Sequence, residues 1–317
     1  MTMKLPVRLT PYIKTRYPYN KLKICRRCNY FTVLGESECP VCGKFALQSA
    51  EERAASVLRR SFWRSRLIVL FITIVGLVLS GSAMQTALLA IGGTALLALL
   101  WTMQGRSNPA LLRLELEKLF HREAYTLIAG LANDRETAIA VFHNGDKPLA
   151  YEMLREIGAL VHTDQLRIEQ ILLLQSFVLR KDMDLMLEPL LMDHFNPDLV
   201  EYIGELAKIR RDLLKENAFR YILLYEAQIL KMEHGESILI GVAGAAVRMK
   251  RYLTLYPYLV LRYARKLPKD RFLRLYRMIQ SNPKSTFGPL YEEVMSVYNE
   301  RYKWDEDFIQ THNERSQ

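Results

Sequence analysis

The longest apolar stretch of the chain runs from Leu67 to Gly105 and contains no charged residue. It is nearly twice as long as one membrane-spanning helix needs to be, which is about 20 residues. Small and polar residues interrupt it at SGSAMQ, residues 80–85. Each half then holds about 18 residues, or about 27 Å of helix, which just crosses the hydrocarbon core of a bilayer. The pattern predicts a two-span transmembrane hairpin over residues 67–105, rather than a buried helical pair of a soluble protein.

Basic residues flank the predicted hairpin on one side only. Arginines precede the first span and follow the second, while the turn between them has no positive charge. The positive-inside rule therefore places both termini in the cytoplasm of a multi-pass cell-membrane protein of bacterial type. Trp63 and Trp101 lie near the cytoplasmic ends, where interfacial indoles are common, and Gly76, Gly92 and Gly93 would let the helices approach closely. Because neither span contains an ionisable side chain, we predict an anchor and not a transporter.

After the hairpin, apolar residues recur at spacings of three and four, as is typical of amphipathic helices. Helix starts are indicated by Asp134 and by three Asn-Pro pairs, because Asn caps a helix and Pro fits its first turn. These pairs lie at residues 108–109, 196–197 and 282–283, and Asn144-Gly145 indicates a helix end. The pattern predicts an all-α domain over residues 106–303, either a helical bundle or an irregular α-solenoid, on the cytoplasmic side of the membrane. A polar tail, residues 304–317, follows.

All four cysteines fall in one segment near the N-terminus, CRRCNYFTVLGESECPVCGK. The two C-x-x-C pairs, at residues 25–28 and 39–42, are typical of metal-bound thiolates in a reducing compartment. Two disulfides in a small secreted knot are the alternative that the same count allows. Gly43 directly follows the last cysteine, at a position where a positive φ is often needed.

CRRC…CPVCG resembles the zinc-ribbon family over residues 23–45. Cys25, Cys28, Cys39 and Cys42 are at the positions of that family's four ligands. The resemblance implies one structural Zn²⁺ ion in a closed tetrahedron of thiolates; iron, as in rubredoxin, is the alternative metal. A ribbon of this size has too little core to fold alone, so metal binding would supply its folding free energy. Zinc ribbons occur in proteins of very different function.

The formal net charge of +10 lies wholly before the hairpin, because acidic and basic residues balance after it. This region divides into a basic N-terminal arm (1–22), the ribbon, and a basic juxtamembrane helix (46–66). A second basic segment, residues 247–279, has interleaved tyrosines. Each surface is a candidate contact for anionic lipid, for a protein partner or for nucleic acid. The candidate contact residues are Arg26, Arg27, Arg59, Arg60, Arg64, Arg66, Arg262, Arg265, Lys266 and Arg274.

The chain contains no recognisable catalytic motif. Its histidines form neither HExxH nor HxxEH, and there is no phosphate-binding loop, no GxSxG and no cysteine outside the cluster. We therefore predict no catalytic residue and identify no small-molecule substrate. Our main hypothesis is a membrane-anchored, cytoplasm-facing scaffold or adaptor that recruits protein partners. The alternatives are a membrane-tethered nucleic-acid-binding protein that uses the ribbon and the Arg/Tyr segment, and a helical enzyme with an unrecognised site.

Overall fold

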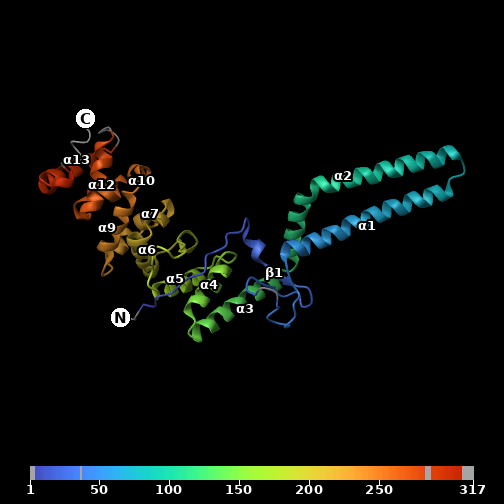
Figure 1. Cartoon of the computed structure of the whole chain (residues 1–317), viewed down its shortest axis with the longest axis horizontal. Coiled ribbons are helices and arrows are strands. Elements are labelled where there is room, and N and C mark those ends of the chain that lie inside the picture. Colours follow the sequence, from blue (N-terminus) through green and yellow to red (C-terminus); the bar gives the residue numbers. More distant parts are fainter. Residues whose placement is uncertain (1–3, 36–37, 283–286, 309–317) are drawn as a thin grey trace. The chain divides into compact units, whose positions relative to one another are not determined.

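The computed structural model describes residues 4–35, 38–282 and 287–308, without the side chains of residues 105–108. The chain forms two compact units (Figure 1). We call residues 13–144 the hairpin unit, and residues 4–12 together with the described part of 145–317 the helical unit. The chain therefore passes between the units twice, once after Tyr12 and once after Asn144.

A three-stranded antiparallel sheet lies near the start of the hairpin unit, just after the 3₁₀ turn η1 (Pro18–Lys21). β1 (Lys23–Cys25) is its central strand, paired with β2 (Phe31–Thr32) and β3 (Leu47–Ser49). Ile24 on β1 lies opposite Phe31 on β2, and both side chains are buried in the ribbon core. The sheet includes residues up to Ser49, beyond the end of the segment that resembles a zinc ribbon.

The last strand leads directly into the first helix of the hairpin. α1 (Ala50–Leu79) is capped by Ser49, whose side chain accepts a hydrogen bond from the amide of Glu52, while the Glu52 carboxylate accepts one from the amide of Ser49. This reciprocal capping box fixes where the helix starts. The amide of Ala50 also donates to the carbonyl of Leu22 just before β1, at 2.9 Å. The ribbon and α1 are thus continuous, with no linker between them.

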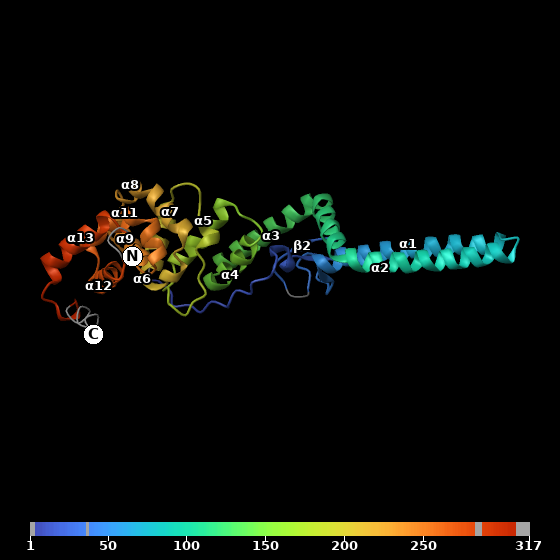
Figure 2. The same cartoon turned by 90° about the horizontal axis from the view of Figure 1, so that it is seen from above.

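α1 and α2 (Ala83–Arg122) run side by side as a long hairpin (Figures 1 and 2). Ala50–Leu79 and Ala83–Gln104 are each long and apolar enough to cross a membrane, and no residue of their most apolar windows is buried. The prediction of two long apolar helices is confirmed. At the connection between them, the hydroxyls of Ser80 and Thr86 lie 2.9 Å apart.

Of the three glycines predicted to let the two helices approach closely, Gly93 does so, whereas a side chain at Gly76 would make only an ordinary contact. A Cβ added at Gly93 would lie 2.7 Å from Thr73 Oγ1 on α1, and one added at Gly76 would lie 3.5 Å from Leu89 on α2. Gly92 faces away, because a Cβ there would meet nothing within 4 Å. Gly93 is therefore the point of closest contact that a side chain would disturb.

Two predicted helix starts are wrong. α2 continues through Pro109, where proline removes one backbone hydrogen bond and its ring crowds the preceding turn, which kinks a helix without necessarily ending it. Figures 1 and 2 show that α2 changes direction after its hairpin part, as a proline within a helix commonly causes. Asp134 lies inside α3 (Ala124–His143) instead of starting a helix, because its carboxylate accepts backbone and side-chain hydrogen bonds from the ribbon. The predicted end at Asn144-Gly145 is confirmed, with Gly145 at φ 93°.

The helical unit is a succession of short helices that pack on one another, and the prediction of a mostly helical C-terminal region is confirmed (Figure 2). α5 packs against α4 and α6, α9 against α6 and α11, and α11 against α13. Among its described residues, 145–282 and 287–302, the helices in chain order are α4 (Lys147–Gly158), α5 (Asp164–Gln175), η2 (Glu188–Leu190), α6 (Pro197–Ile209), η3 (Arg211–Leu213), α7 (Glu216–Leu224), α8 (Glu226–Ile229), α9 (Gly235–Ala246), α10 (Lys250–Leu255), α11 (Pro257–Tyr263), η4 (Ala264–Lys266), α12 (Lys269–Gln280), α13 (Pro289–Val297) and η6 (Tyr298–Tyr302).

Sequence signals explain several boundaries in this unit. Asn196 caps α6 as predicted, since its side-chain oxygen accepts from the amide of Leu199 at 2.9 Å. The third Asn-Pro pair ends at Pro283, which lies outside the described residues. The first residues of the predicted polar tail include part of the packed core. Phe308 is fully buried, and its ring stacks on Tyr302 with centroids 4.8 Å apart. Aromatic burial therefore extends the packed core beyond residue 303.

Candidate metal centre

The two cysteine pairs lie on two backbone knuckles with the same hydrogen-bond pattern. In the first, the amide of Cys25 donates to Tyr30 O and the amide of Asn29 donates to Cys25 O, at 2.9 and 3.0 Å. In the second, the amide of Cys39 donates to Lys44 O and the amide of Gly43 donates to Cys39 O, both at 2.9 Å. Each loop therefore turns tightly enough to direct both of its sulfurs to the same side.

A positive φ closes each knuckle at the same position. Gly43 has φ 61°, which confirms the role predicted for it, and Asn29 has φ 54° at the equivalent place in the first knuckle. Asparagine tolerates this left-handed region better than most residues other than glycine. The first knuckle thus replaces glycine with asparagine at the turn that follows its second cysteine.

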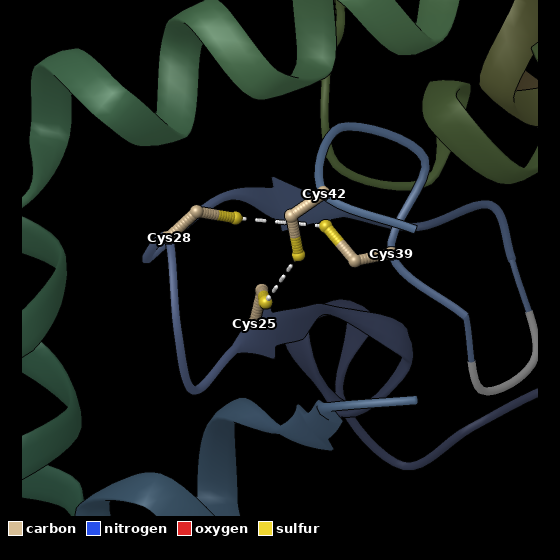
Figure 3. A group of neighbouring side chains, drawn as sticks. All are labelled: Cys25, Cys28, Cys39 and Cys42. Carbon is tan, nitrogen blue, oxygen red and sulfur yellow. Dashed lines mark hydrogen bonds between the residues drawn. The ribbon is translucent and has the colours of Figure 1, made fainter. Parts of the chain in front are cut away.

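The four sulfur atoms converge on one point (Figure 3). Across the two knuckles, Cys25 Sγ lies 3.6 Å from Cys42 Sγ, and Cys28 Sγ lies 3.6 Å from Cys39 Sγ. All four sulfurs lie within 4.8 Å of one another. Four sulfurs about 2.3 Å from a central zinc ion form a tetrahedron with edges of about 3.8 Å. The donor set therefore fits one tetrahedral metal ion.

The same distances exclude the disulfide alternative in this structure. All four cysteines are free thiols, and their closest sulfurs are far beyond the bond length of about 2.05 Å. Cys25 and Cys39 are fully buried, while Cys28 is exposed and Cys42 is half-buried. An ion bound by all four sulfurs would have a complete tetrahedron of protein ligands, without an open position for a substrate.

Crowding gives the thiols different acidities. Burial opposes ionisation of Cys25, but hydrogen bonds from the amides of Cys28 and Arg27 and from neighbouring thiols outweigh it and lower its pKa to about 6. Burial raises the pKa of Cys28 to about 12 and also raises the pKa of Cys42. Among these three thiols, the surroundings therefore favour the thiolate form at Cys25 and oppose it at Cys28 and Cys42. A bound cation would favour the thiolate form of each cysteine that coordinates it.

The ribbon is docked on α3 through a buried carboxylate. Asp134 is only 2% exposed, and it accepts hydrogen bonds from the Thr32 hydroxyl and the Val33 amide, both at 2.8 Å. Burial raises the pKa of Asp134 above its ordinary value, and these hydrogen bonds offset only part of that effect. Nearby, Asn133 donates to the hydroxyl of Tyr30 at 2.7 Å. Strand β2 and the residues beside it are thus held by side chains of α3.

This contact requires a glycine on α3. A Cβ added at Gly130 would overlap the carbonyl oxygen of Phe31 and lie 3.0 Å from its carbonyl carbon. Phe31 itself is fully buried. The backbone of the ribbon therefore rests directly on the backbone of α3.

The basic residues predicted near the ribbon and hairpin occupy different surroundings. Arg26 and Arg27 are exposed on the first knuckle, and Arg26 Nε donates to Gln48 at 2.7 Å. Arg66 lies between the helices, where it donates to Gln104 at 3.0 Å and its guanidinium lies 4.6 Å from the ring centre of Trp101. The other three predicted arginines, Arg59, Arg60 and Arg64, are exposed on α1.

The basic residues predicted in the helical unit mostly have intramolecular partners. Arg265 donates to Glu293 and Glu300 at 2.6 and 2.9 Å, and Arg274 donates to the carbonyl of Arg248 at 2.8 Å. Two further ion pairs join Arg262 to Glu226 and Lys266 to Glu236. Their acidic partners come from other helices, so the apparent excess of positive charge in this segment is offset in space.

No protein-family model, no curated protein and no solved structure matches this chain. Sequence reasoning found the four cysteines but missed Asp134, Gly130 and Asn29. Asp134 and Gly130 act on residues about a hundred positions away, so no local pattern identifies them. Asn29 had a signal, because it follows the second cysteine of its knuckle just as Gly43 does.

Proposed function

We propose that this protein is a membrane-anchored scaffold or adaptor whose zinc ribbon stabilises the base of a transmembrane hairpin and whose helical unit recruits a protein partner. One observation carries the proposal: the ribbon is continuous with α1 and docked on α3, which follows α2. The metal site therefore ties together the two chain ends of the hairpin. A closed site at such a junction suits a structural role better than a chemical one.

The surface of the hairpin supports membrane insertion. Large apolar side chains are exposed along both helices, far more than a soluble protein tolerates on its surface. They include Leu67, Phe71, Ile72, Val78, Leu88 and Ile91. Arg66 and Trp101 mark one end of the hairpin with a cation and an indole, as at a membrane interface. With the basic residues on that same side, both termini would face the cytoplasm.

Four thiolates around one ion favour zinc as the bound metal. The small sheet buries few residues of its own, so the metal would contribute much of the ribbon's stability. Iron has the same geometric support, and the metal content of the purified protein separates the two. Scaffolding has more support than the alternative of a membrane-tethered nucleic-acid binder. Three of the basic residues expected to bind phosphates, Arg262, Arg265 and Lys266, already pair with carboxylates.

Purification from native membranes in mild detergent, with and without nuclease, tests the recruitment role. We expect a stoichiometric protein partner that survives nuclease treatment and elutes with the chain. Nucleic acid without a protein partner would contradict the scaffold and favour the tethered binder. Charge reversal of Arg26 and Arg27 shows whether the ribbon itself contacts the partner. If the helical unit alone recruits it, abundance and recruitment should both stay normal, whereas loss of recruitment at normal abundance would assign the contact to the ribbon.

A further inference from the structure

Residues 4–12, which we call the strap, lie extended on the helical unit and are bound mainly through their backbone. At the start of the strap, the amide of Leu5 donates to Ser176 O and the carbonyl of Leu5 accepts from the amide of Val178, both at 2.9 Å. This is a parallel bridge between Leu5 and Phe177. The strap therefore joins the helical unit as a short added strand, which is one of the ways proteins bind peptides.

Charged side chains of the helical unit form hydrogen bonds with the rest of the strap backbone. The amide of Thr10 donates to Glu152 at 2.5 Å, and its carbonyl accepts from Arg155 at 2.9 Å. The amide of Tyr12 donates to Asp184 at 2.7 Å. Glu152 and Arg155 lie three residues apart on one face of α4, where both can reach the same strap residue. Arg180 adds a further donor, to the carbonyl of Val7 at 3.2 Å.

The strap sequence suits this recognition. Leu5 and Thr10 are each bonded through both amide and carbonyl, and each precedes a proline, Pro6 or Pro11. A residue before proline is restricted to extended conformations, so both are pre-organised for binding. The strap thus contains two X-Pro dipeptides, and in each the hydrogen-bonded backbone groups belong to residue X. Lys4, at its start, pairs with Glu205 on α6.

The strap is held without deep burial of its own side chains. Most are exposed, Leu5 at 42%. By contrast, the surface beneath the strap contains a buried charged side chain. Arg155 is 3% exposed, and its Nε and Nη1 have no hydrogen-bond partner among the described residues. Its guanidinium also lies 5.2 Å from the ring centre of Tyr12. Departure of the strap would return this cation to water, and its hydration would offset part of the free energy needed to break the strap's hydrogen bonds.

We propose that this strap site, formed by Ser176, Val178, Glu152, Arg155, Asp184 and Glu205, is a peptide-binding site in which residues 4–12 are the resident ligand. It accepts from a partner protein an extended segment with two X-Pro steps at the same spacing and a Lys or Arg before the first. Because the site binds mainly backbone amides and carbonyls, the other side chains of that segment can vary. That such a partner protein exists rests on the proposed scaffold function.

Exchange of the strap tests this directly in the full-length protein. A protease recognition sequence inserted between Tyr12 and Ile13 would be accessible, since Ile13 is 75% exposed. After cleavage in detergent, we expect a fluorescent peptide, KLPVRLTPY with blocked ends, to bind with a stoichiometry of one per chain. The uncleaved protein should bind it at least a hundredfold more weakly, because a tethered strap competes at an effective millimolar concentration. Absence of binding to the cleaved chain, or its unfolding on cleavage, would overturn the proposal.

Matched peptides and variants test the recognition itself. N-methylation of the peptide at Thr10 removes a donor to a charged acceptor and should weaken binding about tenfold. N-methylation at Arg8, whose amide has no partner among the described residues, should leave binding unchanged. In the protein, Glu205→Gln should weaken binding, whereas Glu201→Gln on the same helix should not. Equal effects within either pair would contradict backbone and Lys4 recognition.

The two proposals fail separately. If the peptide does not exchange but a protein partner still copurifies, the scaffold stands and the strap is a permanent structural element. If the peptide exchanges but no partner copurifies from native membranes, the strap site is real and the recruitment role is wrong.

Discussion

Replacing Gly130 by alanine tests whether the ribbon depends on its contact with α3. Alanine favours the helix itself by about 1 kcal/mol relative to glycine. Its Cβ, however, would overlap the Phe31 carbonyl oxygen and lie 3.0 Å from the carbonyl carbon and 3.2 Å from Phe31 Cβ. All of these atoms belong to the buried ribbon backbone or to its first side-chain atom, so the ribbon has to move away from the helix.

That movement has a calculable cost. It lengthens the hydrogen bonds that Asp134 accepts from Thr32 and Val33, now both 2.8 Å. A hydrogen bond to a charged group contributes about 1.5–3 kcal/mol, and Asp134 would stay buried with fewer partners. Complete loss of both bonds would cost about 3–6 kcal/mol, which leaves about 2–5 kcal/mol after the helix gain of about 1 kcal/mol is subtracted. Because the bonds lengthen instead of breaking, we expect the lower part of that range, about 2–3 kcal/mol. Gly241→Ala in α9 is the matched control, because its Cβ would make only an ordinary contact at 3.5 Å.

Amide hydrogen exchange in detergent measures this local stability. In Gly130→Ala, residues 31–34 should exchange about 30- to 150-fold faster, as 2–3 kcal/mol requires, while the core of the helical unit stays protected. In Gly241→Ala, exchange at residues 31–34 should match the unchanged protein. Unaltered exchange at these residues in Gly130→Ala would refute the reasoning, because it would show that the ribbon does not rest on α3.

Three further predictions concern other parts of the chain. Gly93→Ala should lower the unfolding free energy of the hairpin by about 1–3 kcal/mol through overlap with Thr73. Gly92→Ala, whose Cβ would meet nothing, should be neutral or stabilising by up to about 1 kcal/mol; unfolding in detergent compares the two variants, and equal values would contradict the packing. Phe308→Ala should cost about 3–5 kcal/mol in unfolding free energy because the ring is fully buried, while Trp304→Ala, at a side chain 84% exposed, should change it by less than about 0.5 kcal/mol. Removal of the metal by a chelator should make residues 23–49 sensitive to protease while the helical unit stays resistant, and an intact ribbon after complete removal would count against a structural metal.

The features predictable from the sequence are those recorded in local patterns. An uncharged stretch predicts two apolar helices wherever it lies in a fold, and paired C-x-x-C motifs converge because each knuckle turns tightly by its own hydrogen bonds. Asn196 was recognisable as a cap because both its partner and its proline are nearby in the sequence.

The misread residues depend on distant partners. Asp134 is of a residue type that often caps helix starts, yet its hydrogen-bond partners are on the ribbon, 101 and 102 residues away. The N-terminal arm was assigned from its charge, but residues 4–12 are bound to the helical unit through backbone groups, which charge does not reveal. The basic segment near residue 265 appeared unpaired because the carboxylates that offset it lie on other helices.

The metal content of the protein in washed membranes tests the central claim most directly. Membranes would be washed with alkaline carbonate, the retained chain purified in detergent, and its metals counted for the unchanged protein and for Cys25→Ser. The account predicts a carbonate-resistant chain with one zinc ion, lost in the variant. Release of the chain by carbonate, or iron in place of zinc, or a full zinc complement in Cys25→Ser would contradict it.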